Sequence, residues 1–131
     1  MNNELIIKSK IDNVYFVENF IDELAIEQSI ATELYGNIMI STIEAVTNAI
    51  VHGNKSDPAK QVRIKVFRDK HILQITVSDE GPGFDIDKIP DPTKPELIEQ
   101  PDGRGIFLMR NLTDDLKFDK NGAEVTLIFN I

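Results

Sequence analysis

The chain contains no cysteine and no long uncharged apolar run. The absence of cysteine excludes a disulfide framework and a thiolate metal site. No stretch approaches the roughly 18 uncharged apolar residues of a membrane span. The first segment, MNNELIIKSKID, has too short an apolar run, with acids around it, for a signal peptide. These absences favour a cytoplasmic protein that has no membrane partner.

Basic residues are also scarce relative to acidic ones. The chain has 14 Lys and Arg against 22 Asp and Glu, a net charge of −8. Such a surface repels a polyanion on average, so we expect no direct nucleic-acid partner. A nucleotide stays compatible with this charge, because a few amides, one metal ion and one or two cations can outweigh it locally.

The order of expected elements predicts the fold. At 131 residues the chain fits a single domain, residues 1–131. Residues 4–8 read as a strand, residues 12–24 as a helix with Asp12 as its N-cap, and residues 29–54 as a longer helix that ends at Gly53 and Asn54. Residues 61–79 and 116–131 read as hairpins, turning at 68–71 and at Asn121–Gly122. We expect an α+β two-layer sandwich with a mixed, mainly antiparallel sheet and helices on one face.

A long segment between the hairpins lacks any periodic pattern of apolar residues. Residues 84–103 hold four prolines and few apolar residues. A structureless loop of about twenty residues is uncommon in a compact domain and is often a functional lid. We therefore expect a lid there, followed by a helix over residues 103–116 that opens on glycines.

The second helix carries a stripe of short polar side chains. At about 100° per residue, Asn37, Ser41, Glu44 and Asn48 share one face, with His52 at its border. Glu44 and Asn48 stand at i and i+4 and point to the same place. A carboxylate can accept a proton, and a carboxamide oxygen can ligate Mg²⁺. The pair is compatible with a base beside a metal, and also with two exposed polar residues on an amphipathic helix.

The stretch DEGPGF directly follows an alternating apolar run. As a simple turn it needs only its glycines and proline. As a binding loop, it would point the Asp79 carboxylate into a cleft, where an exocyclic amine could donate to it. Gly81 and Gly83 would then let the backbone lie against a ligand, where a Cβ would collide.

The stretch DGRGIFLM offers a similar choice. Gly103 and Gly105 precede a helix, whose free amides and positive dipole end can hold a polyphosphate. A lone G-x-G is weak evidence, and this one matches neither the P-loop nor the dinucleotide fingerprint.

The three signals follow one another in a recognisable order. A helical E-x-x-x-N, a strand-end D-x-G-x-G, a long lid and a helix-opening G-x-G resemble the N, G1 and G2 boxes of the GHKL (Bergerat-fold) ATPase superfamily. The resemblance covers nearly the whole chain. The stretches EAVTNAIVHGN and TKPEL…GRGIFLMRNLTDDL are similar to bacterial anti-sigma factor serine/threonine-protein kinases. The resemblance therefore favours the binding-loop interpretation of DEGPGF.

This resemblance implies a role for each matching residue. Glu44 matches the general base, Asn48 the Mg²⁺ ligand and Asp79 the adenine-binding aspartate. ATP or ADP with Mg²⁺ is the implied ligand. The implied nucleotide-binding residues are Asn48, Thr47, Asp79, Gly81, Gly83, Lys94, Gly103, Arg104, Gly105 and Thr126. Two of them have an open alternative: Thr47 either contacts the nucleotide or only packs, and Lys94 is either a phosphate contact or a solvated lysine.

Three features depart from the family pattern. Many relatives have a threonine after the glycine of the last box, where this chain has Ala123; Thr126 either takes over its contact or alternates outward on the strand. Kinase members can carry an arginine before the second glycine box, but here the nearby arginine is Arg104, inside it. No phosphoacceptor-histidine helix precedes the domain, so we do not expect a complete sensor histidine kinase.

The leading functional hypothesis is a protein-serine kinase. The resemblance implies transfer of the ATP γ-phosphate to a serine of an antagonist (STAS-type) protein, a sigma factor as a further partner, and a homodimer. Two alternatives stay open: a nucleotide-gated protein-binding module without kinase activity, and a slow ATPase.

Overall fold

The computed structural model describes residues 3–82 and 101–131, without the side chains of residues 101–104. Gly83, Lys94 and residues 84–100 of the expected lid lie outside the described residues. Within the described part of the chain, no helix combines the length and the apolar character needed to cross a bilayer.

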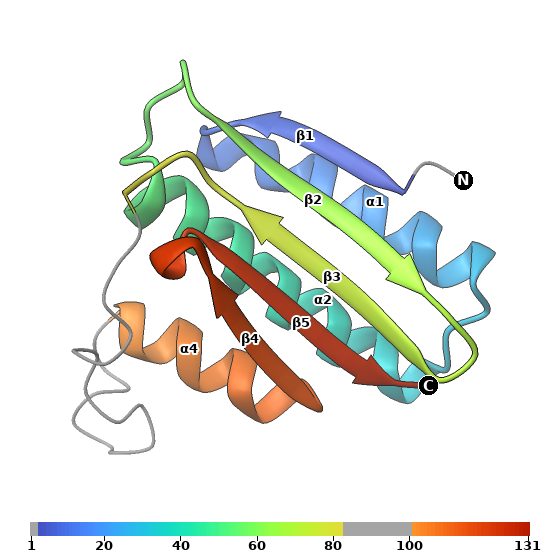
Figure 1. Ribbon diagram of the computed structural model, residues 1–131. Coiled ribbons are helices and arrows are strands. Elements are labelled where there is room, and N and C mark those ends of the chain that lie inside the picture. Colours follow the sequence, from blue (N-terminus) through green and yellow to red (C-terminus); the bar gives the residue numbers. More distant parts are fainter. Residues whose placement is uncertain (1–2, 83–100) are drawn as a thin grey trace.

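One five-stranded sheet forms a layer of the fold (Figure 1). Its strands lie in the order β1 (Glu4–Lys8), β2 (Gln61–Arg68), β3 (Ile72–Ser78), β5 (Glu124–Asn130) and β4 (Asp115–Asp119). Every pairing among these strands is antiparallel, so the described sheet is not mixed as expected. Consecutive strands pair as the hairpins β2–β3 and β4–β5, which are antiparallel by construction. Strand β1 then pairs antiparallel with β2, and β5 pairs antiparallel with β3.

The helices form the second layer, on one face of the sheet (Figure 1). They are α1 (Val14–Glu27), α2 (Thr32–Asn48) and α4 (Pro101–Leu112). Alternate residues of the three central strands point toward them and are buried, among them Val62, Ile64, Leu73, Ile75, Val77, Val125, Leu127 and Phe129. This period of two is what places one apolar face of the sheet against the helices. The expected α+β sandwich is confirmed.

Both predicted hairpins form. At the first turn, the Asp69 carboxylate accepts hydrogen bonds from the backbone N–H groups of His71 and Ile72, each at 2.8 Å. At the second, Lys120 and Asn121 adopt left-handed φ values of 52° and 56°. Short polar residues tolerate this conformation best, which explains why Asn-Gly signals a turn.

The predicted helix ends need correction. Asp12 is not an N-cap: it lies inside a 3₁₀ turn, Ile11–Asn13, and α1 begins only at Val14 without a side-chain cap. The α-helix α2 begins at Thr32, ends at Asn48, and passes into a π-helical turn over Ala49–Gly53. The last helix begins at Pro101, so the final residues of the expected lid are already helical. Proline suits the first helical position, because no partner is needed there for its missing N–H.

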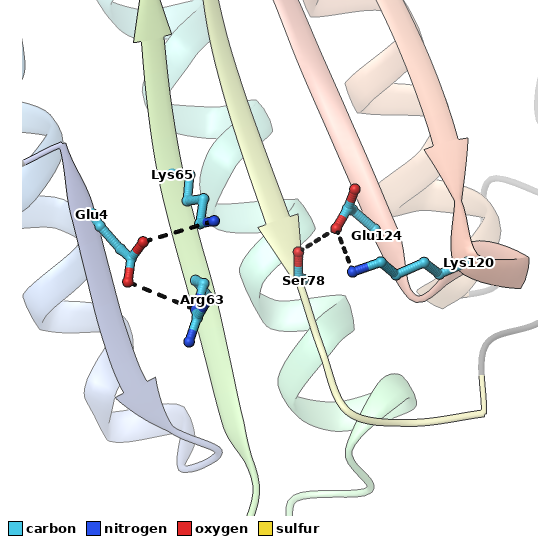
Figure 2. A network of polar contacts seen from close by, with 6 residues as sticks. All are labelled: Glu4, Arg63, Lys65, Ser78, Lys120 and Glu124. Atoms are coloured by element: carbon cyan, nitrogen blue, oxygen red, sulfur yellow. Dashed lines mark hydrogen bonds and ion pairs between the residues drawn. The ribbon is translucent and has the colours of Figure 1, made fainter.

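The second face of the sheet is polar (Figure 2). Glu4 lies 3.7 Å from Arg63 and 3.9 Å from Lys65, on neighbouring strands. Burial alone would raise the pKa of Glu124. The Ser78 hydroxyl donates to its carboxylate at 2.9 Å, and the Lys120 ammonium lies 3.2 Å away. These two groups outweigh burial, so the pKa of Glu124 lies below its usual range. Exposed pairs of this kind add little stability. Their charges make this face polar.

Candidate functional site

A cavity of about 200 Å³ lies between the end of α2, strands β3 and β5, and α4. Its wall is mainly apolar, with four side chains that carry polar groups. The apolar and glycine positions are Ala45, Ala49, Gly53, Val77, Ile106, Met109, Phe118, Gly122, Ala123 and Val125, and the polar ones are Asn48, His52, Lys55 and Asp79. An apolar pocket with a few convergent polar groups is the usual form of a small-molecule site.

Asp79 stands where β3 leaves the sheet. Its backbone N–H donates to the carbonyl of Ala123, directly before β5, at 2.9 Å, and its Oδ1 accepts from the Gly81 N–H at 2.8 Å. Burial raises the pKa of Asp79, and the Gly81 amide and the Lys60 charge offset part of that effect. Asp79 is half-buried, so its carboxylate has lost part of its hydration, and a further hydrogen-bond donor would stabilise its charged form.

Two glycines allow the backbone to close around this carboxylate. A Cβ on Gly53 would collide with the Asp79 carboxylate, and a Cβ on Gly81 would collide with the Gly53 carbonyl oxygen. The π-helical turn after α2 and the loop after β3 therefore lie in close contact at these two glycines. Sequence reasoning assigned Gly81 to the site but read Gly53 only as a helix end, because its contact with Asp79 joins segments far apart in the chain.

Lys55 also lines the cavity and was not predicted. It has a left-handed φ of 55° in the turn after α2. A single lysine in a polar turn looks like a solvated side chain, so the sequence held no signal for this placement. His52 lines the cavity as well, at the border of the polar stripe where the periodicity places it.

The polar stripe of α2 is only partly directed at the cavity. Asn48 lines it, whereas Glu44, one turn earlier and half-buried, and Thr47, also half-buried, do not. Ser41 is buried, and its hydroxyl donates to the Asn37 carbonyl at 2.6 Å within the helix. Ser41 is therefore a packing residue of the helix and not part of an open polar face.

Helix α4 packs against α2 at Asn48. A Cβ on Gly105 would lie 2.7 Å from Asn48 Nδ2, so a side chain there would displace the amide. Gly103 and Arg104 precede it in the first turn of the same helix. The second glycine box thus meets the E-x-x-x-N helix at Gly105 and Asn48.

The described residues offer few ligands for a metal ion. No group of three His, Asp or Glu side chains that could hold one exists among residues 3–82 and 105–131. The Asn48 carboxamide oxygen is a hard donor that suits Mg²⁺, but alone it would bind weakly. A metal fits this site only together with phosphate oxygens of a ligand.

The last strand corrects one predicted residue. Thr126 hydrogen-bonds the Thr76 hydroxyl at 3.2 Å, while its neighbours Val125 and Leu127 are buried toward the helices. It therefore lies on the polar face of the sheet, away from the cavity, as the outward alternation of the strand requires. Ala123 does line the cavity, but it has no hydroxyl.

Comparison with known proteins agrees with this geometry. Residues 7–129 match the family described as the histidine kinase-like ATPase domain. The anti-sigma F factor of Bacillus licheniformis is 40% identical over 89 residues, which cover 65% of this chain and 60% of that protein. For the anti-sigma F factor of Bacillus subtilis (strain 168) the identity is 38%, with the same coverage. The matched part thus spans about 60% of the relatives' length.

The family match extends from β1 to the end of β5 and so includes every part of the cavity wall. The GHKL resemblance seen in the order of the three boxes is confirmed. The chain therefore belongs to the histidine kinase-like ATPase domain family, and membership implies that it binds a nucleotide.

Proposed function

We propose that this chain binds ATP in the cavity and transfers its γ-phosphate to a serine of a partner protein. The observation that supports this proposal is the half-buried Asp79 carboxylate, which lines a mainly apolar cavity and accepts a hydrogen bond from the Gly81 amide. An adenine ring would fill the slot, and its exocyclic amine would donate to that carboxylate. We call Gly53, Asp79 and Gly81 the base end of the site.

The opposite part of the site suits phosphates. Asn48 and Gly105 meet where α4 packs on α2, and the first turn of α4 contains Gly103 and Arg104. The amides of a first helical turn attract anions. We call Glu44, Asn48 and Gly105 the phosphate end. A cavity of about 200 Å³ is smaller than the roughly 300–1,000 Å³ of pockets for drug-sized ligands, so it suits the base more than a whole nucleotide.

Each residue of the phosphate end has a distinct role in this proposal. Asn48, with phosphate oxygens, would hold Mg²⁺, which supplies neutralisation of the charge on the transferring group. Glu44 takes the proton of the attacking serine hydroxyl, a role that its place one turn before Asn48 allows. Residues 84–103 act as the lid in this proposal.

The names of the relatives support one partner in this proposal, a sigma factor. Proteins named anti-sigma F factors match this chain. We infer that a sigma factor binds this chain and that an antagonist protein of the STAS type supplies the serine. A homodimer and a cytoplasmic location belong to the same proposal.

One observation favours a second candidate, a nucleotide-gated binding module without transfer. Asn48 lines the cavity, but Glu44 does not. A nucleotide can then bind with its adenine in the cavity without any contact to Glu44. The same geometry also permits slow hydrolysis, in which Glu44 accepts a proton from water.

Calorimetry with ADP and inosine diphosphate (IDP) tests the base end, because inosine lacks the exocyclic amine. We expect wild type to prefer ADP, and Asp79→Asn to weaken ADP binding by about 10- to 100-fold, as for loss of a charged hydrogen bond. The matched control is Asp69→Asn, the same change at the opposite end of β3. Equal ADP affinity in wild type and Asp79→Asn would refute the assignment.

A further inference from the structure

Asn54 is a fully buried polar residue that follows the π-helical turn. Its Nδ2 donates to the Ser9 hydroxyl at 2.7 Å and to the Gln61 carbonyl at 2.9 Å. Its Oδ1 accepts from the Glu80 backbone N–H at 2.7 Å. One side chain thus joins the end of β1, the start of β2 and the loop after β3.

The orientation of this amide is determined by its partners. The Gln61 carbonyl can only accept, so it requires the NH₂ group of Asn54, and the Glu80 N–H can only donate, so it requires the oxygen. Ser9 completes the set, because its hydroxyl accepts from Asn54 and donates to the Lys60 carbonyl at 2.9 Å. A side chain that could not form these bonds would leave buried donors and acceptors unpaired, which is costly.

The bond to Glu80 acts on the neighbouring residue Asp79. The Asp79 N–H is held by the Ala123 carbonyl, and the next N–H along the chain, that of Glu80, is held by Asn54. Two successive amides on either side of the Asp79 Cα are therefore fixed to different parts of the fold. Fixing both amides sets the direction in which the Asp79 carboxylate leaves the backbone.

We propose that Asn54 is a positioning residue, which holds the Asp79 carboxylate in the place where it receives the exocyclic amine of an adenine. Asn54 is not among the residues that line the cavity, so it acts through the Glu80 amide and touches no ligand. This inference rests on the proposed function of Asp79. It assigns base selectivity to a residue that the sequence presents only as the end of a helix.

The test compares ADP with IDP in calorimetric titrations of the full chain. Asn54→Ala should lower the preference for ADP over IDP by about tenfold, the effect expected for one misplaced hydrogen bond, and should leave IDP affinity near wild type. Ser9→Ala is the matched control. It removes two bonds of the same buried network, those of the Ser9 hydroxyl with Asn54 and Lys60, but leaves the bond from Glu80 to Asn54, so the preference for ADP should remain.

A double-mutant cycle with Asp79→Asn separates positioning from general loss of structure. If Asn54 acts through Asp79, Asn54→Ala should have little further effect on the ADP to IDP ratio once Asp79 is changed. An equal loss of affinity for both nucleotides, or an unchanged ratio, would overturn the proposal.

If Asn54→Ala does not fold, the same titrations are carried out with Asn54→Asp. Its carboxylate still accepts from the Glu80 N–H but no longer donates to Ser9 and Gln61, so it should be less stable and still prefer ADP. A loss of that preference would contradict the role of the Glu80 bond. A wild-type protein with equal affinity for ADP and IDP would instead refute the proposed function of Asp79 itself.

Discussion

The two ends of the site are constructed differently. At the base end, Asp79 is held by its own loop through the Gly81 amide, and the backbone of the π-helical turn after α2 lies against it at Gly53. At the phosphate end, Glu44 and Asn48 stand one turn apart on α2, and α4 packs against Asn48 at Gly105. Backbone contacts thus hold the carboxylate that we propose recognises the base, whereas helix α2 and its packing against α4 place the groups proposed for chemistry.

The π-helical turn joins the two ends. Helix α2 carries Asn48 as its last residue, and the turn Ala49–Gly53 then brings the Gly53 backbone against Asp79. A π-helical turn is rare and frequently marks a functional site. A substitution that alters the conformation of this turn should therefore displace Gly53 from Asp79, while Asn48 keeps its position on the regular helix.

The largest effect is expected at Glu44. Glu44→Gln keeps the size and hydrogen bonding of the side chain but removes the proton acceptor, so phosphoryl transfer should fall by about 10²–10⁴-fold with ATP binding retained. The measurement is transfer of labelled γ-phosphate to a candidate antagonist protein, with free phosphate followed in parallel. Glu33→Gln, in the first turn of α2, is the control. Transfer by Glu44→Gln at the wild-type rate would show that Glu44 is not the base.

A smaller effect is expected at Gly105. A methyl group there would press on the Asn48 amide, so Gly105→Ala should weaken binding of Mg²⁺–ATP by about tenfold, as for loss of one good polar contact. The unfolding free energy should hold or rise, because alanine favours a helix interior by about 1 kcal/mol over glycine. Gly36→Ala in α2, where the added Cβ meets no atom within 4 Å, is the matched control. Unchanged Mg²⁺–ATP affinity in Gly105→Ala would separate Gly105 from the phosphate end.

The smallest effect concerns stability and pH at the base end. Burial raises the pKa of Asp79, so the folded state binds this proton more tightly than the unfolded chain. The favourable contribution is present below the unfolded pKa of 3.8 and is lost as pH rises through the raised folded pKa. Asp79→Asn should therefore raise the Tm of the nucleotide-free protein at pH 7, and the gain should shrink on acidification toward pH 4. A gain that grows on acidification would contradict this direction.

Local signals predicted the parts of the fold whose causes are local. Alternating apolar residues and turn chemistry at Asp69 and at Asn121–Gly122 were enough for both hairpins. Asp12 failed as a cap, because a 3₁₀ turn precedes α1 and takes the place of a side-chain cap. Thr126 was assigned to the nucleotide by resemblance, but strand alternation directs it to the other face.

Local signals were also limited at the site, where several contacts join segments far apart in the chain. The order of the three boxes led to Asn48, Asp79, Gly81 and Gly105, which the structure places around or beside one cavity. Gly53 and Asn54 could not be found in this way. Their partners lie far along the chain, and a glycine followed by asparagine is an ordinary helix end in sequence. Tertiary contact, not local pattern, gives these two residues their place in the site.

The central claim is the direction in which the nucleotide lies in the site, with adenine at Asp79 and phosphates at Asn48. A crystal structure of the complex with ADP tests this claim most directly. We predict the adenine ring in the cavity, with its exocyclic nitrogen within about 3.2 Å of an Asp79 carboxylate oxygen. The phosphates should lie toward Asn48 and Gly105. A nucleotide bound in the reverse direction, or with its ring outside the cavity, would contradict the account.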